Sequence, residues 1–218
     1  MSALLVTGTD TDVGKTFVTC ALAHALRTQG RRVTVMKPVE TGVTTVPDDA
    51  ERLRTAAADD APLDEICPYR FAAPLAPTVA ARAEGRRVDV DHLVALVTQR
   101  AAAADVLLVE GAGGLLVPLD GALTYADLAV RCALPVLIVG ANRLGTVNHS
   151  ALTARVAAAV GLIVRGFVLS QPAPTTDESA ATNAGEITAL TGLRCRGTLG
   201  HLRDPRDAVP LLDTTDLV

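Results

Sequence analysis

The sequence predicts an α/β fold: a single doubly wound domain over residues 1–218, with a mostly parallel central sheet and helices on both faces. Three observations predict this class. Short apolar, β-branched segments alternate with longer Ala-rich segments, as in parallel βαβ units. The chain is long enough for one well-buried α/β domain and rather short for two. No internal repeat or linker divides it.

Six short segments are predicted to form the strands of this sheet. Two of them are continuously apolar, which is typical of parallel strands buried on both faces. The first leads into a polar, Gly-containing turn and then into a helical stretch, as the opening of a βαβ unit does. The six predicted strands cover residues 3–7, 33–36, 106–109, 135–140, 163–169 and 195–199.

Five longer segments are predicted to be helices. The first ends near Gly30, the second begins with acidic residues that the helix dipole favours, and the third is long and amphipathic. The predicted helices cover residues 15–29, 48–58, 89–104, 147–160 and 178–190. Pro-rich stretches are predicted to be loops within the domain, at residues 62–77, 171–174 and 205–210.

Composition argues against several classes of function. A net charge of −4 gives no broad basic surface, so no nucleic-acid partner is expected. No apolar run reaches the roughly 20 residues of a membrane span, and residues 1–6 lack the basic region of a signal peptide. The four cysteines lack metal-ligand spacing and are expected to be reduced thiols. These features predict a cytoplasmic protein with no membrane partner.

A phosphate-binding loop is predicted between the first strand and the first helix, at residues 8–16. Gly14 lets the backbone approach phosphate oxygens, Lys15 reaches the β- and γ-phosphates, and Thr16 ligates Mg²⁺. In the strict motif the first Gly stands where this chain has Thr9, and Gly8 lies one residue upstream. The position of the loop between strand and helix indicates a fold of the P-loop NTPase type.

Lys15 and Lys37 are the only lysines among the 20 basic residues of the chain. A compact ammonium on a flexible stem reaches crowded phosphate oxygens better than a broad guanidinium does. Lys37 follows the second predicted strand, and ligands of open α/β sheets gather beyond the carboxyl ends of the strands. The two ammonium groups are therefore expected at one crevice.

Acidic residues are candidates for the same crevice. Glu110 directly follows a buried strand, like the Mg²⁺-binding acid of P-loop proteins, and the glycines within residues 111–114 allow backbone amides to approach a ligand. Asp49 stands at a helix start, where it is either a cap or a Mg²⁺ ligand, and Asp48 competes for either role. Asp12 is either a solvated loop acid or a contact to Mg²⁺ or a substrate amine.

Five motifs stand in the order that one enzyme family shows, at residues 8–16, 37–42, 68–77, 110–114 and 145–149. On these motifs the chain resembles the dethiobiotin synthetase family from residue 3 to about residue 170. The resemblance implies a homodimeric enzyme of biotin biosynthesis with sites near the subunit interface. It would close the ureido ring of dethiobiotin from 7,8-diaminopelargonic acid, CO2 and ATP, and release ADP and phosphate.

The chemistry implied by the resemblance brings one anion to another. A substrate amine takes up CO2 as a carbamate, and a carbamate oxygen attacks the γ-phosphate to give a carbamic–phosphoric anhydride. The second amine then closes the ring and expels phosphate. Because both reactants are negatively charged, cations must gather where they meet, and Lys15, Lys37 and Mg²⁺ supply that charge.

The resemblance also implies roles for individual residues. The implied catalytic residues are Lys37, Lys15 and Thr11, and the implied Mg²⁺ ligands are Thr16, Asp49 and Glu110. The diamine would be bound by Asp12, Lys37, Thr41 and, from the partner subunit, Gly145, Thr146, Val147 and Asn148. The alternative for the turn before His149 is a plain helix start. The implied nucleotide-binding residues are Asp12, Val13, Gly14, Lys15, Thr16, Phe17, Asp49, Glu110, Gly111, Ala112, Gly113, Ser170, Gln171, Gly200, His201 and Leu202.

Two departures from the family pattern leave the base of the nucleotide open. The family often has Asn-Asp where this chain has Ser170 and Gln171, and residues 200–202 match the later base-contacting stretch loosely. ATP is the expected co-substrate, and other nucleoside triphosphates remain alternatives.

Two other classes of P-loop protein are alternatives. A related amidoligase of the cobyrinate type uses a glutaminase domain with a Cys nucleophile, for which the sequence has no room. A dimeric ATPase switch of the partitioning type usually carries an additional Lys early in the loop, where this chain has Asp10. Such switches often end in a basic helix, whereas Asp213 and Asp216 make the last residues here acidic.

Overall fold

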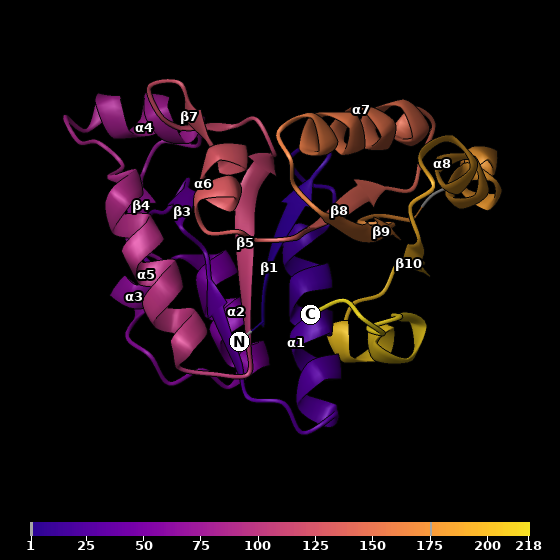
Figure 1. The fold of residues 1–218 in the computed structure, drawn as a ribbon, viewed down its shortest axis with the longest axis horizontal. Coiled ribbons are helices and arrows are strands. Elements are labelled where there is room, and N and C mark those ends of the chain that lie inside the picture. The colour runs from indigo at the N-terminus through magenta and orange to yellow at the C-terminus, as the bar shows by residue number, and fades with distance from the viewer. Residues whose placement is uncertain (1, 175) are drawn as a thin grey trace.

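A six-stranded parallel sheet forms the centre of the molecule, in the order β10-β9-β8-β1-β5-β2 (Figure 1). The computed structural model describes residues 2–174 and 176–218. All six predicted strands are confirmed, as are the α/β class and the parallel sheet. The strands are β1 (Ser2–Gly8), β2 (Val33–Met36), β5 (Val106–Gly114), β8 (Val136–Ala141), β9 (Val164–Ser170) and β10 (Cys195–Leu199).

Helices cover both faces of the sheet, because alternate residues of its strands point to opposite sides. Leu5 and Leu107 belong to one apolar core, with residues of three helices, α5 (Val90–Ala102), α6 (Tyr125–Arg131) and α7 (Thr146–Ala159). Leu4 and Leu108 belong to the other core, with residues of α1 (Lys15–Thr28) and α2 (Asp48–Ala57). The doubly wound arrangement is therefore confirmed.

Several short elements lie where the sequence predicted loops or nothing regular. The predicted loop at residues 62–77 contains a helical turn and a strand, and residues 205–210 lie in a 3-10 helix that packs against α1. These elements are too short to show a period in the sequence. They are β3 (Val39–Thr41), α3 (Leu63–Ile66), β4 (Tyr69–Phe71), α4 (Pro77–Ala83), β6 (Pro118–Asp120), β7 (Leu123–Thr124) and η2 (Pro205–Leu211). The strands β3 and β4 pair with each other across about 30 residues, and β6 pairs with the adjacent β7.

The last predicted helix divides into two pieces, η1 (Glu178–Ala181) and α8 (Asn183–Thr191). The final residues of the chain are packed against the body of the protein. Leu217 is fully buried, and the Asp213 backbone N–H donates to the Arg196 carbonyl at 2.7 Å. This tail follows η2, and Leu217 packs into the apolar core that contains residues of α1 and α2.

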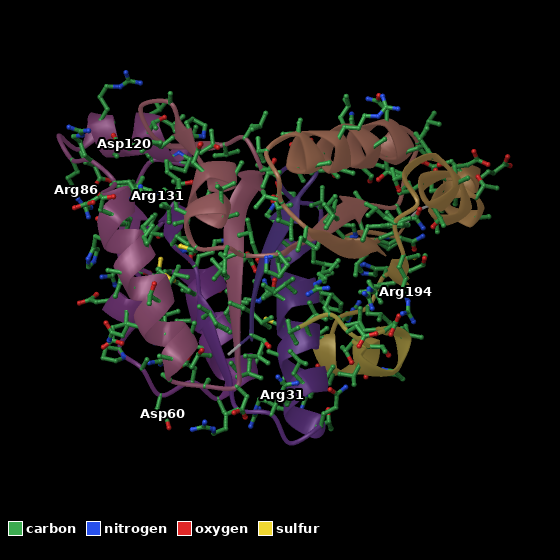
Figure 2. The ribbon with its side chains drawn as sticks, in the orientation of Figure 1. Arg31, Asp60, Arg86, Asp120, Arg131 and Arg194 are labelled. Carbon is green, nitrogen blue, oxygen red and sulfur yellow. The ribbon has the colours of Figure 1, made fainter. Side chains whose placement is uncertain are left out.

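Most charged side chains lie at the periphery of the molecule, as the six labelled residues in Figure 2 do. Exposed ion pairs of this kind, such as Arg87 with Asp120 at 2.6 Å, contribute little to stability. Among residues 2–174 and 176–218, no helix is both long and apolar enough to cross a membrane. The four cysteines are free, and Cys20 and Cys67 are buried.

Candidate active site

The candidate site lies at the carboxyl ends of three neighbouring strands. Lys15 opens α1 after β1, Lys37 directly follows β2, and Glu110 lies within β5, the strand between those two. Glu110 stands opposite Val6 in the pairing of β1 with β5. The three segments converge because parallel strands end at the same edge of the sheet.

The phosphate loop turns tightly around the Lys15 side chain. Gly14 adopts a left-handed conformation with φ 89° just before α1, and the Lys15 Nζ donates to the Asp10 carbonyl at 2.9 Å. A Cβ on Gly8 would lie 2.8 Å from that Nζ and 2.6 Å from the same carbonyl. Gly8 therefore provides the space in which the ammonium group sits. Burial and, next, the charge of Lys37 lower the pKa of Lys15.

Lys37 forms a buried ion cluster with two carboxylates. Its Nζ lies 2.6 Å from Glu110 Oε1 and 2.7 Å from Asp49 Oδ2. Burial by itself lowers the pKa of Lys37, but the charges of Glu110 and Asp49 and their hydrogen bonds raise it above the usual 10.5. Lys37 is therefore a fixed positive charge at neutral pH.

Thr16 joins the same cluster through its hydroxyl oxygen. Its Oγ1 lies 2.9 Å from Asp49 Oδ1 and 2.8 Å from Glu110 Oε1, yet a hydroxyl has one proton and can donate to one of them at a time. Glu110 Oε2 is buried and has no hydrogen-bond partner among residues 2–174 and 176–218. One hydroxyl and two carboxylates with unused lone pairs are hard oxygen donors, which Mg²⁺ prefers.

This donor set fits Mg²⁺ better than a softer metal. In the part of the chain that the structure describes, no group of three or more His, Cys, Asp or Glu side chains is arranged to hold a metal. Mg²⁺ does not require such a group, since it keeps several waters and takes one or two carboxylates together with substrate phosphates. Thr16, Asp49 and Glu110 are therefore the residues here that suit it.

Asp48 and Asp49 separate clearly in the structure. The Asp48 side chain is 84% exposed and faces Arg52, 3.9 Å away, whereas the Asp49 side chain is 33% exposed and bonds to Lys37 and Thr16. Asp48 is thus outside the ion cluster. Asp49 is also not the cap of α2, because its side chain is turned away from the helix amides toward Lys37.

A cavity of about 530 Å³ opens above the cluster, in the size range of small-ligand sites. Most of the residues that the sequence singled out line it: Thr11, Asp12, Gly14, Lys15, Thr16, Phe17, Lys37, Thr41, Asp49, Ala112, Gly113, Ser170, Gln171, Gly200 and Leu202. Asp12 adopts a left-handed conformation with φ 53°. Its side chain is exposed, so both the solvated and the ligand-binding interpretation remain open.

Some residues of the predicted set do not line this cavity. Glu110 and Gly111 are buried beneath the cavity. Val13 packs into the apolar core that contains residues of α1 and α2. His201 is exposed, with its Nδ1 3.3 Å from the Gln171 carbonyl. The predicted nucleotide-binding roles of these four residues stay predictions.

The segment of residues 145–148 lies apart from the main cavity. Gly145 has φ 96° and precedes α7, and Thr146 borders a separate small hollow together with Thr9, Asp10 and His149. Val147 packs against the core, and Asn148 is exposed. Within one subunit, this predicted diamine-binding segment therefore does not meet Lys37 and Thr41.

Four further residues line the cavity: Glu40, Arg52, Pro172 and Arg203. The first two had a signal in the sequence. Glu40 lies within the motif at residues 37–42, and Arg52 follows Asp49 by three positions on a helix, which places the two side chains on one face. Arg203 directly follows residues 200–202, the predicted base-contacting stretch.

A parallel sheet whose first strand leads through a glycine-rich turn into a Lys-Thr helix start defines a P-loop nucleotide-binding protein. In agreement, the model of the AAA domain family matches residues 2–206. Among solved structures, the chain resembles chloroplast FtsY from Physcomitrella patens (TM-score 0.53, 19% identity, 94% of this chain and 60% of that one). It also resembles the signal recognition particle receptor FtsY from Elizabethkingia anophelis (TM-score 0.52, 18% identity, 99% and 63%). The chain spans less than two thirds of each, and these likenesses show the fold alone.

Curated relatives are much more similar in sequence. The chain is 50% identical to ATP-dependent dethiobiotin synthetase BioD of Anaeromyxobacter sp. (strain Fw109-5), over 94% of this chain and 92% of the relative. It is 44% identical to the BioD of Aquifex aeolicus (strain VF5), over 88% of this chain and 86% of that one. The chain belongs to the family of ATP-dependent dethiobiotin synthetases, which are ATP-dependent ligases.

Proposed function

We propose that this protein makes dethiobiotin from 7,8-diaminopelargonic acid, CO2 and ATP with the help of Mg²⁺. The observation that carries the proposal is the placement of Lys37 beside Asp49, Glu110 and Thr16, next to the phosphate loop. The identity to dethiobiotin synthetases supports it over an amidoligase or an ATPase switch. The cavity of about 530 Å³ is lined by both the phosphate loop and Lys37, so it lies where the triphosphate and the diamine would meet.

The charges of the site suit the attack of one anion on another. Lys15 and Lys37 are close enough for the charge of one to lower the pKa of the other. An amine nitrogen bonds to the carbon of CO2 and loses a proton, and an oxygen of the resulting carbamate displaces ADP from the γ-phosphorus. Lys37 donates hydrogen bonds to the carbamate and the transferred phosphoryl group, and Lys15 and Thr11 hold the phosphates.

Ring closure follows at the same place. The second amine attacks the carbamoyl carbon and loses a proton, and phosphate leaves as the C–O bond breaks. Asp12 and Thr41 line the same cavity and would orient the diamine. Thr16, Asp49 and Glu110 would hold Mg²⁺, which when bound supplies positive charge to the phosphates.

The test is to give the purified protein diamine, bicarbonate, Mg²⁺ and each nucleoside triphosphate in turn, and to measure dethiobiotin by mass spectrometry. We expect one equivalent of nucleoside diphosphate for each dethiobiotin, with ATP as a substrate. Because Ser170 and Gln171 line the cavity, the comparison between nucleotides also tests how these residues select the base. Nucleotide hydrolysis that proceeds without dethiobiotin would contradict the proposal.

We further propose that the protein is a homodimer in which residues 145–148 complete the partner's site. Two observations support this: Asn148 is exposed apart from the cavity of its own subunit, and the neighbouring Leu144 is 81% exposed. Buried free thiols such as Cys20 and Cys67 support a cytoplasmic location.

Mixing two inactive variants tests the shared site. Lys37→Ala and Asn148→Ala chains should each lack activity, but a heterodimer of the two has one site with both residues intact. Random assortment would then restore about a quarter of the wild-type activity. Full activity of Asn148→Ala alone would show that the segment is a plain helix start.

A further inference from the structure

Helix α2 begins without a capping side chain of its own. Its first residue is Asp48, and the residue before it, Pro47, has no side-chain hydrogen bond to the helix. The first backbone N–H groups of a helix have no partner within the helix and must find one elsewhere. Acidic residues in the first turn of α2 do not fill this need, because Asp48 and Asp49 bond to other groups.

Glu40 caps α2 from outside the helix. Its Oε1 accepts from the Asp49 backbone N–H at 3.1 Å, and its Oε2 accepts from the Ala50 backbone N–H at 3.0 Å. Glu40 belongs to β3, and it is 8% exposed. The linking residues Thr44, Thr45 and Val46 are exposed, so the carboxylate ties the start of α2 to β3 across a loop that has little packing of its own.

Asp49 takes part in both contacts: its backbone N–H bonds to Glu40, and its side chain belongs to the ion cluster of Lys37. Asp49 Oδ1 accepts from Thr16 and Asp49 Oδ2 accepts from Lys37. The position of the Asp49 carboxylate relative to Glu110 and Thr16 therefore depends on where the first turn of α2 sits. A carboxylate with two oxygens fixes that turn in two places.

We infer that Glu40 is a positioning residue that sets the Asp49 carboxylate for the divalent cation of the proposed reaction. The inference rests on the proposed function, in which Thr16, Asp49 and Glu110 hold Mg²⁺. Glu40 itself acts through the helix, since both of its oxygens are directed at backbone amides of α2. Residues behind metal ligands of this kind typically change metal affinity about 10- to 100-fold when they are replaced.

The test compares Glu40→Gln with a matched control variant in the helical turn that Glu40 caps. Glutamine keeps the size of the side chain but has one acceptor oxygen, so one of the two helix amides faces an NH2 donor instead. The control is Glu51→Gln, which makes the same chemical change in the first turn of α2. The Glu51 carboxylate pairs with Arg54 at 3.0 Å on the helix surface and is not part of the cap.

Binding of Mn²⁺ to each full-length protein with ADP present, followed by electron paramagnetic resonance of the free ion, gives a readout that is independent of turnover. For Glu40→Gln we expect about tenfold weaker Mn²⁺ binding. The Mg²⁺ concentration for half-maximal dethiobiotin formation should rise to match, while kcat at saturating Mg²⁺ stays near the wild-type value. Glu51→Gln should match the wild type in all three.

Three outcomes overturn the inference. If wild-type protein binds Mn²⁺ and Glu40→Gln binds it equally well, the positioning role is wrong and the proposed function stands. If Glu40→Gln lowers kcat at saturating Mg²⁺ without weakening Mn²⁺ binding, Glu40 serves a different purpose. If wild-type protein shows neither Mn²⁺ binding nor dethiobiotin formation, the proposed function fails and the inference with it.

A variant that keeps the charge covers the case in which Glu40→Gln does not fold. Glu40→Asp retains a carboxylate on a stem one methylene shorter, which cannot reach both amides of α2. It should show the same weakened Mn²⁺ binding and faster amide hydrogen exchange at residues 48–51, with unchanged exchange in α1. Wild-type Mn²⁺ binding in Glu40→Asp would contradict the inference.

Discussion

Two buried ion clusters lie against strand β2, one beside its middle and one beyond its carboxyl end, and they differ in how completely their atoms are bonded. In the first, the Arg100 guanidinium pairs with Asp59, and both side chains are almost fully buried. In the second, Lys37 pairs with Asp49 and Glu110. Both clusters carry compensating charges in a region of low dielectric constant.

The Arg100 cluster completes the open edge of the sheet. The Val35 N–H and C=O point away from β5. Because β2 is an edge strand, no further strand of the described residues is there to bond them. The Val35 N–H donates to Asp59 Oδ2 at 2.9 Å, and the Val35 carbonyl accepts from Arg100 Nε at 3.1 Å. Asp59 Oδ1 accepts from the Ala61 N–H at 3.2 Å. This cluster bonds its own groups and the strand edge, and it has a structural role.

The Lys37 cluster leaves bonding capacity unused and opens to a cavity. In the described part of the chain, Glu110 Oε2 is buried without a hydrogen-bond partner, and the Thr16 hydroxyl has one proton for two nearby carboxylate oxygens. Lys37 and Asp49 line the cavity, whereas Arg100 and Asp59 do not. Both clusters are buried and charged. Only the Lys37 cluster combines unused oxygen atoms with a neighbouring cavity, and these two features suit it to bind and transform a ligand.

The largest effect expected is on turnover, from a change in the Lys37 cluster. Lys37→Arg keeps the charge but replaces a compact ammonium by a wide planar group, which cannot occupy the same point between Asp49 and Glu110. We expect kcat for dethiobiotin formation to fall at least about 100-fold. The assay is the mass-spectrometric one, with circular dichroism to verify folding. Near-normal turnover of Lys37→Arg would contradict the proposed role of the Lys37 cluster in the reaction. The functional difference between this cluster and the Arg100 cluster would then be unsupported.

A change in the Arg100 cluster should instead affect stability. Arg100→Met leaves Asp59 buried without its cation and should lower the free energy of unfolding by about 3–5 kcal/mol. Urea unfolding followed by circular dichroism measures this change. Nucleotide affinity of the folded variant should stay within about twofold of wild type, because Arg100 lies outside the cavity. If Arg100→Met lost activity without losing stability, the structural role assigned to the Arg100 cluster would be wrong.

Replacing both Asp59 and Arg100 separates the cost of an unpaired buried charge from the contribution of the bonds to the strand edge. The Asp59→Leu, Arg100→Met double variant has no unpaired charge that is fully buried, because Glu65, the second partner of Arg100 at 3.6 Å, is 38% exposed. It should therefore be more stable than Arg100→Met. It should remain about 1–3 kcal/mol below wild type, since the Val35 N–H and carbonyl lose their partners. Equal stability of the double variant and wild type in urea would show that the bonds to the strand edge contribute nothing.

The smallest effect expected is a pH dependence of the Lys37 cluster. Burial opposes ionisation of Asp49, but the charge of Lys37 and hydrogen bonds from Lys37 and Thr16 lower the pKa of Asp49 below its usual 3.8. The unfolded chain then binds more protons than the folded one as pH falls, so this contribution to stability is lost below about 3.8. Urea unfolding of wild type and Asp49→Asn should show a constant difference near neutral pH that shrinks below that value. A difference that grows on acidification would contradict the assignment.

Much of the fold could be predicted because its signals are local. Most of the six central strands are short, largely apolar segments separated by turns or helices, and all six lie where the sequence indicated. Three-residue strands such as Val39–Thr41 carry too little periodicity to be recognised, and they form by pairing with a distant segment. The helix predicted at 178–190 was wrong as one continuous piece, since the stretch divides near Thr182.

The candidate site was predictable to a similar degree. Lys15, Lys37 and Glu110 each come after a predicted strand in the sequence, and parallel strands bring such positions to one edge. The sequence could not separate Asp48 from Asp49, because neighbouring residues of the same type give the same pattern. Nor could it identify Glu40 as the cap of α2, since that contact crosses an exposed loop. The catalytic and binding roles of these residues stay predictions.

The sequence by itself therefore determined the class of fold, the phosphate loop and the two ammonium groups, because strand periodicity and short motifs are properties of neighbouring residues. Tertiary structure alone decided which carboxylates meet Lys37, which glutamate holds α2, and that residues 145–148 lie apart from the cavity of their own subunit. Those outcomes depend on the direction in which each side chain leaves its helix or strand and on contacts between distant segments. Such directions are fixed by packing of the whole chain, and no local pattern records them.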